Sequence, residues 1–222
     1  MGKVVECFRK TFLGYYGYWV ILTYLSIISG ATGIYMAISG HVGWAVLCMM
    51  ISGICDMFDG PVAKLKKNRT DREKGFGIQI DSLADLISFG VLPVMIGYAI
   101  GTPFGVAMGI IIAAAYILTA LIRLAYFNVI EAELTSRGEC RKFYEGLPVT
   151  TVALILPLIY ALCSYFNPAA LAITYTVFLI VISVAFIARF RIPKLRGRYL
   201  IIFVLMGLPI VSFLLWIIIG GL

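Results

Sequence analysis

Apolar runs of about 20 residues recur along almost the whole 222-residue chain. An α-helix needs about 20 apolar residues to cross the roughly 30 Å hydrocarbon core of a bilayer. Only 13% of the residues are charged, and the mean hydropathy is +1.01. The sequence therefore predicts an all-α, polytopic bundle of transmembrane helices. The expected spans are approximately residues 19–38, 43–63, 78–99, 105–127, 146–165, 168–188 and 199–220.

Positive charge alternates between the segments that connect these spans, within a formal net charge of +7. Lys and Arg gather in the amino-terminal stretch, after the second span, around the connection of the fourth and fifth spans, and before the last span. The short segments around His41, Thr102 and Asn167 contain neither residue. By the positive-inside rule, the amino terminus lies in the cytoplasm and the carboxyl terminus outside. This alternation indicates a multi-pass protein of the cell membrane and argues against a nucleic-acid partner.

The chain divides into a short amino-terminal segment and one membrane domain. Residues 1–16 mix Lys and Arg with Val, Phe, Leu and Tyr, which predicts an amphipathic juxtamembrane helix or a short ordered tail. Residues 17–222 make up the expected transmembrane domain.

Four aspartates lie in the expected second and third spans, toward the cytoplasmic side: Asp56, Asp59, Asp81 and Asp85. A carboxylate deep in a membrane helix is unfavourable by roughly 2.5 to 3.5 kcal/mol on insertion scales, so four of them require a cation. The first two are three residues apart and the last two are four apart, so each pair shares one helix face. An antiparallel hairpin of the two helices would bring both faces together.

Carboxylates without a nearby histidine form an all-oxygen site, which suits Mg²⁺, Mn²⁺ or Ca²⁺ and not zinc or copper. Two divalent ions would balance the four negative charges. The only histidine, His41, falls in an expected outer loop, away from the acids. If the site is catalytic, its general base should therefore be a carboxylate. Buried acids also mark ion pathways, which leaves a cation transporter as the alternative. The position of the acids toward one end and the lack of a visible repeat favour an enzyme.

Small residues recur on the faces that carry the acids. Gly60 directly follows the second aspartate, Ala63 lies seven residues after the first, and Gly77 lies four before the third. Such positions let a flat ligand approach closely, or they only permit tight helix packing.

The stretch DMFDGPVAKLKKNRTDREKGFGIQIDSLAD, residues 56–85, resembles the signature of the CDP-alcohol phosphotransferase family. That signature reads D-x-x-D-G-x-x-A-R, a spacer, and G-x-x-x-D-x-x-x-D. Seven of its eight fixed positions are met, by Asp56, Asp59, Gly60, Ala63, Gly77, Asp81 and Asp85. Two features depart from it. Lys64 stands at the arginine position and loses the planar fork for phosphate, and 12 residues separate it from Gly77.

The resemblance implies a six-helix core, here with a seventh helix, and a homodimer in the membrane lipid. It also implies site roles. Asp56, Asp59 and Asp81 would hold a first metal, and Asp59, Asp81 and Asp85 a second. Asp85 would take the proton from the incoming hydroxyl. The CDP contacts would be Asp56, Gly60, Ala63, Lys64 and Gly77, with Thr23 and Ser26 of the first span as weaker candidates.

The stretches at 81–101, 123–128 and 144–151 resemble the phosphatidylserine synthases of this family. This resemblance implies metal-dependent transfer of a phosphatidyl group from CDP-diacylglycerol to L-serine. Serine carries a carboxylate, which Arg123 could hold, with Asn128 and Glu145 as further polar contacts. Alternatively, Arg123 reaches the headgroup region. Glycerol 3-phosphate or inositol phosphate are alternative acceptors. They would need extra cationic residues for a second phosphate, which Arg137, Arg141 and Lys142 could supply.

Overall fold

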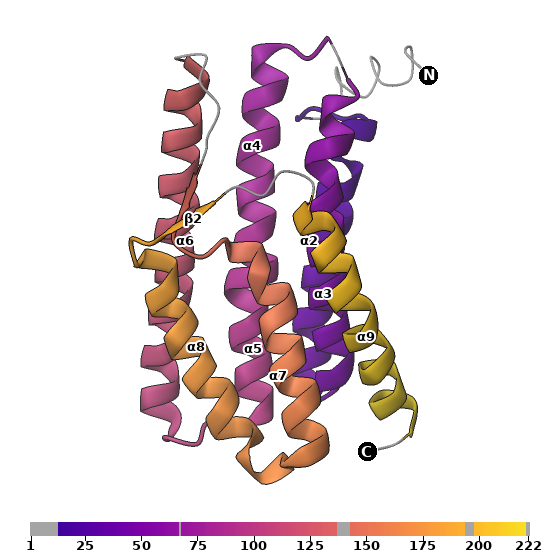
Figure 1. Cartoon of the computed structure of the whole chain (residues 1–222), viewed down its shortest axis with the longest axis vertical. Helices are drawn as coiled ribbons and strands as arrows, with labels where there is room; N and C mark the ends of the chain where they lie inside the picture. The colour runs from indigo at the N-terminus through magenta and orange to yellow at the C-terminus, as the bar shows by residue number, and fades with distance from the viewer. Residues whose placement is uncertain (1–12, 67, 137–142, 194–197, 221–222) are drawn as a thin grey trace.

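The protein is described here by a computed structural model that covers residues 13–66, 68–136, 143–193 and 198–220. Long helices run along the length of the molecule and form a bundle (Figure 1). Its α-helices are α2 (Ile21–Ile38), α3 (Val42–Lys64), α4 (Asp71–Asp85), α5 (Leu92–Ile100), α6 (Val106–Ser136), α7 (Val152–Phe166), α8 (Leu171–Ile187) and α9 (Arg198–Gly220). The shorter helical elements are η1 (Tyr18–Val20), η2 (Leu86–Val91), η3 (Val149–Thr151) and η4 (Pro168–Ala170). Two three-residue strands, β1 (Phe143–Glu145) and β2 (Arg191–Pro193), pair antiparallel.

Six helical segments of the described chain are long and apolar enough to cross a membrane, which confirms the predicted polytopic, all-α class. They are Tyr18–Ile38, Val42–Lys64, Asp71–Ile100, Val106–Leu134, Val149–Phe166 and Pro168–Ile187. The predicted seventh helix forms as α9, whose described apolar part, Gly207–Gly220, is shorter. Its crossing of the membrane stays a prediction, as does the orientation of the chain. The predicted amphipathic segment at 1–16 lies mostly outside the described residues.

The third span begins earlier than hydropathy predicted, at Asp71 instead of residue 78. Thr70 caps this helix: its side-chain oxygen accepts a hydrogen bond from the backbone N–H of Glu73, and the Glu73 carboxylate accepts one from the N–H of Thr70. This reciprocal capping box fixes a helix start in a polar segment. Hydropathy marks only the apolar part of a helix, so it missed the first two turns of α4.

Helices α2 and α3 pack closely along their length because small side chains line their contact. The hydroxyl of Ser52 donates to the carbonyl of Ser26 at 2.9 Å, and the hydroxyl of Ser26 donates to the carbonyl of Ser52 at 3.4 Å. A Cβ on Gly33 would lie 2.8 Å from Leu92 and 2.9 Å from Cys48. The pair α2 and α3 therefore forms a tight unit against which α4 and α5 pack.

A π-helical turn, η2, follows directly after the last of the four aspartates. Pro93 has no N–H to donate to the carbonyl of Phe89, four residues earlier. Tyr116 of α6 donates its hydroxyl to that carbonyl at 3.1 Å, and Tyr175 of α8 donates to the carbonyl of Pro93 at 3.3 Å. Two buried tyrosines thus stabilise an irregular helix that continues from the acidic segment.

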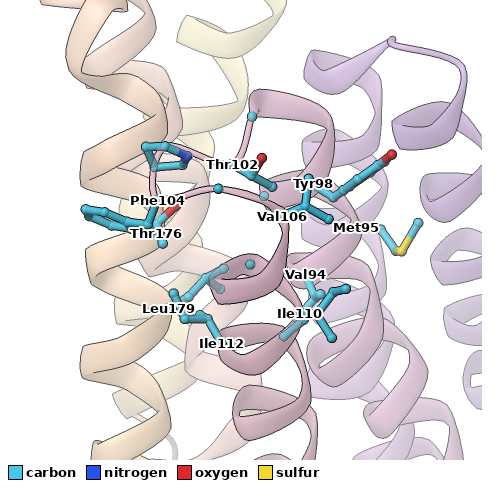
Figure 2. Close-up of a pocket in the computed structure, with 16 residues that line it drawn as sticks. Val94, Met95, Tyr98, Thr102, Phe104, Val106, Ile110, Ile112, Thr176 and Leu179 are labelled. Carbon is cyan, nitrogen blue, oxygen red and sulfur yellow. The ribbon is translucent and has the colours of Figure 1, made fainter.

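A cavity of about 290 Å³ lies between the last turns of α5, the start of α6, and α8. Thr102, Phe104 and Thr176 are among the residues around it (Figure 2). Its lining contains no Asp, Glu, Lys, Arg or His. An apolar cavity without a charged group does not suit the binding of a charged substrate, so the candidate site lies elsewhere.

Candidate active site

Three of the four aspartates meet between α3 and α4. One carboxylate oxygen each from Asp56, Asp81 and Asp85 lie within 4.8 Å of one another. The carboxyl groups of Asp56 and Asp85 are also in side-chain contact, as are those of Asp59 and Asp81. The two helix faces that the spacing predicted to converge are therefore brought together.

The acidic cluster is largely shielded from solvent. Asp59 and Asp85 expose 9% and 8% of their surface. Among the described residues, no Lys or Arg forms an ion pair with any of the four aspartates. Buried carboxylates at this density repel one another unless a cation lies between them.

The arrangement fits a divalent cation. Oxygens bound to one Mg²⁺ or Ca²⁺ at roughly 2.0 to 2.6 Å lie at most about 4 to 5 Å apart, and the three carboxylate oxygens meet that limit. Asp59 falls outside this group of three, but it contacts Asp81. Both predicted ligand sets, Asp56, Asp59 and Asp81 for one ion and Asp59, Asp81 and Asp85 for the other, include Asp59, and both stay predictions.

Asp59 accepts a hydrogen bond from α2. The hydroxyl of Thr23 on α2 is buried and donates to Oδ2 of Asp59 at 3.0 Å. Ser26, one turn further along α2, instead donates to the backbone carbonyl of Ser52. The structure thus brings Thr23 to the aspartates, whereas Ser26 takes part in helix packing, and its predicted nucleotide contact gains no support.

Gly60 of the motif borders open space on the α3 side. A Cβ built on Gly60 would meet no atom within 4 Å. Ala63 is half-buried, and Lys64 is exposed and is the last residue of α3. A ligand at the aspartates would therefore have room to extend past this end of α3.

Gly77, on α4, lies under two side chains that the sequence did not single out. A Cβ at this position would lie 2.6 Å from Nη2 of Arg69 and 3.4 Å from the ring of Trp19. The Arg69 guanidinium lies 4.4 Å from the centre of the Trp19 ring, and Nζ of Lys66 lies 5.4 Å from it. The sequence carries a signal for the start of α4, the capping box of Thr70 and Glu73, but none for the contact of Arg69 with Trp19.

Arg123, predicted to hold the acceptor, is buried on α6 with 6% of its surface exposed. Its Nε donates to the carbonyl of Leu147 at 3.2 Å and its Nη2 to the carbonyl of Gly146 at 3.3 Å. The alternative, that Arg123 reaches the headgroup region, is wrong. A buried guanidinium must find acceptors nearby, and Arg123 finds them in these two carbonyls. Both bonds hold the segment that leads into α7.

Asn128 lies close to the acidic helix. Its Nδ2 donates to the hydroxyl of Ser82 at 2.8 Å, and that hydroxyl donates to Oδ1 of Asn128 at 3.1 Å. Ser82 directly follows Asp81, so Asn128 connects α6 to the site.

Glu145 lies on β1, opposite Arg191 in the strand register. The cations predicted for other acceptors, at 137, 141 and 142, lie outside the described residues.

Comparisons with known proteins agree with this motif. The family profile of the CDP-alcohol phosphatidyltransferases matches residues 20–189, from α2 through α8. The CDP-diacylglycerol–serine O-phosphatidyltransferase of Saccharomyces cerevisiae is 37% identical over 151 residues, which cover 62% of this chain and 52% of the yeast protein. The chain thus matches about half the length of that relative.

Two prokaryotic relatives match over more of their length. The archaetidylserine synthase of Methanothermobacter thermautotrophicus is 32% identical over 177 residues, 80% of this chain and 70% of the relative. The CDP-diacylglycerol–serine O-phosphatidyltransferase of Helicobacter pylori is 31% identical over 179 residues, 79% of this chain and 71% of the relative. Because the profile covers most of the membrane bundle, including all four aspartates, the chain belongs to the CDP-alcohol phosphatidyltransferase family.

Proposed function

We propose that this chain transfers a phosphatidyl group from CDP-diacylglycerol to the hydroxyl of L-serine, giving phosphatidylserine and CMP. The observation that carries the proposal is the convergence of Asp56, Asp81 and Asp85 without a protein cation among the described residues. Family membership supports the reaction class, and the names of the yeast and Helicobacter relatives support serine as the acceptor.

The aspartates would hold two divalent ions, Mg²⁺ or Mn²⁺, with Ca²⁺ as a further possibility in an all-oxygen site. Asp56, Asp59 and Asp81 would bind the first ion, and Asp59, Asp81 and Asp85 the second. When bound, such ions supply positive charge beside a diphosphate and its leaving group. Thr23 would keep Asp59 oriented toward Asp81 through its hydrogen bond.

Asp85 would accept the proton of the serine hydroxyl as that oxygen bonds to the phosphorus that carries diacylglycerol. The bond from this phosphorus to the bridging oxygen of the diphosphate breaks, and CMP leaves with the electron pair. The open space beside Gly60 supports placing the nucleotide there, with Ala63 and Lys64 along it.

Arg123 and Asn128 are the proposed acceptor contacts, together with Glu145. Asn128 is joined through Ser82 to the acidic helix, which supports a position beside the reacting hydroxyl. Arg123, hydrogen-bonded to the Gly146–Leu147 segment, would bind the carboxylate of serine. The basic end of the bundle, at the α3–α4 connection, would face the cytoplasm of the cell membrane. A homodimer is part of the same proposal, and it rests on the family alone.

An acceptor screen tests the proposed function. Purified protein in lipid nanodiscs receives CDP-diacylglycerol, a divalent metal, and either serine, glycerol 3-phosphate, inositol phosphate or choline, while CMP release is recorded. We expect CMP release with serine, and a lipid product that contains serine. Release with another acceptor alone would contradict serine specificity. Metal-dependent cation transport without CMP release would contradict the enzyme assignment altogether.

A further inference from the structure

The departures from the family signature concern the segment that connects α3 with α4. Lys64 replaces the arginine of the signature, so the end of α3 carries a point charge instead of a planar fork. The spacer that follows is also longer than expected, with 12 residues before Gly77. This spacer carries two arginines, Arg69 and Arg72.

Arg69 of the spacer lies directly over the face of Gly77. Nη2 of Arg69 is 2.6 Å from the point where a Gly77 Cβ would stand. Gly77 precedes Asp81 by four residues, which is one helical turn and about 6 Å along the axis. Residues four apart share a helix face. Arg69 therefore lies one turn from the acidic cluster, on the side of α4 that carries it.

The guanidinium is held in place but not fully satisfied. It lies on the ring of Trp19, at 4.4 Å from Cζ to the ring centre, and its Nη2 donates to the backbone carbonyl of Glu73 at 3.2 Å. Its Nε is buried and has no hydrogen-bond partner. Trp19 itself is 3% exposed, so it forms a rigid base for the cation.

Local charge around Arg69 favours an anion. Lys66 shares the Trp19 ring with Arg69, at 5.4 Å from the ring centre, and forms an ion pair with Glu73 at 3.0 Å. Two cations thus lie beside one carboxylate. A buried, unpartnered guanidinium N–H next to this excess positive charge is suited to a phosphate oxygen.

We propose that Arg69 is a binding residue for the diphosphate of the cytidine nucleotide, supplying from the spacer the planar guanidinium that position 64 lacks. This assignment rests on the proposed function, because it takes the nucleotide to bind beside the aspartates. Trp19 positions Arg69, and Gly77 leaves room for the guanidinium. The longer spacer then supplies, through Arg69, the guanidinium that the lysine at position 64 lacks.

Nucleotide binding to the full chain tests this assignment without relying on turnover. The probe is CDP with Mg²⁺, titrated against the fluorescence of Trp19 in a Trp44→Phe, Trp216→Phe background, which leaves Trp19 as the only tryptophan. We expect Arg69→Ala to weaken CDP binding roughly ten- to a hundredfold, as for loss of a charge-assisted hydrogen bond. The CDP affinity of Arg69→Lys should fall between those of the unmodified protein and Arg69→Ala, because lysine keeps the positive charge but lacks the planar fork.

Arg72→Ala is the matched control, since Arg72 is an exposed cation on the first turn of α4. We expect it to change CDP affinity by less than about threefold, as for a screened surface charge. An Arg69→Ala effect no larger than that of Arg72→Ala would overturn the assignment. Thermal melting of each variant in the same nanodiscs separates lost binding from lost folding.

A double variant separates a binding role from simple packing. If Arg69 only packs against Gly77, the methyl group of Gly77→Ala would fill part of the space that Arg69→Ala leaves. The double variant should then regain the CDP affinity of the unmodified protein, and the proposal would be overturned. If Arg69 binds the diphosphate, the double variant should bind no better than Arg69→Ala. Failure of the unmodified protein to bind CDP would instead count against the proposed function itself.

Discussion

The hydroxyl of Thr23 donates a hydrogen bond of 3.0 Å to Oδ2 of Asp59, between residues 36 apart in the sequence. This bond connects α2, which carries no acid, to the aspartates of α3. Both side chains are buried. Hydrogen bonds to a charged acceptor contribute about 1.5 to 3 kcal/mol, enough for a single hydroxyl to decide how a carboxylate is oriented.

Removal of the Thr23 hydroxyl should therefore impair the site more than the fold. We expect Thr23→Val to lower kcat/KM for CDP-diacylglycerol by roughly tenfold, and Thr23→Ser to restore most of it. Thr32→Val is the control, because the Thr32 hydroxyl only donates to the carbonyl of Ile28 within the same helix. Equal losses in Thr23→Val and Thr32→Val would show that the bond to Asp59 has no special role.

Asp85→Asn should separate activity from stability. Loss of a general base typically costs a factor of about 100 to 10,000 in rate, so we expect kcat to fall within that range. Without metal, the Asp85→Asn variant should melt at a higher temperature than the unmodified protein, because the substitution removes one negative charge from a crowded acidic cluster. Steady-state CMP release and thermal melting in EDTA measure the two effects.

The control for that variant is Asp71→Asn, whose carboxylate is exposed and pairs with Lys74 at 3.1 Å. It should keep near-normal turnover and an unchanged melting temperature, since exposed ion pairs contribute about 0 to 1 kcal/mol. A melting temperature that falls in Asp85→Asn would contradict the view that the aspartates repel one another without metal.

Metal binding should be visible as stabilisation. A ligand that binds only the folded state at about 100 times its Kd adds about 2.7 kcal/mol, so Mg²⁺ or Mn²⁺ should raise the Tm of the EDTA-treated protein. The double variant Asp56→Asn, Asp81→Asn should lose this rise, because it removes two of the three clustered carboxylates. Full CMP release after exhaustive chelation would refute a metal requirement.

The hydroxyl of Tyr116 should matter for stability. Tyr116→Phe removes the bond to the carbonyl of Phe89 in the π-helical turn, and a lost bond of this kind costs roughly 1 kcal/mol. We expect a lower Tm, measured in nanodiscs with EDTA, and a smaller change for Tyr35→Phe, whose side chain is exposed. An unchanged Tm in Tyr116→Phe would indicate that the carbonyl finds another donor.

The sequence alone predicted where the long apolar helices lie and which aspartates share a helix face. Twenty apolar residues cross a bilayer only as a helix with its backbone bonds satisfied internally, so hydropathy predicts spans one by one. The spacing of Asp81 and Asp85 likewise places both on one face before any fold is known. Hydropathy failed at the start of α4, where the Thr70 cap acts in a polar segment.

Tertiary structure decided which side chains complete the site. Thr23 and Ser26 are both small polar residues of α2, and only packing showed that the first contacts Asp59 while the second bonds to the α3 backbone. Local periodicity sets the direction of a side chain from its own helix, but its partner depends on how distant helices cross and how loops return. For the same reason, only the folded chain revealed Arg69 over Gly77.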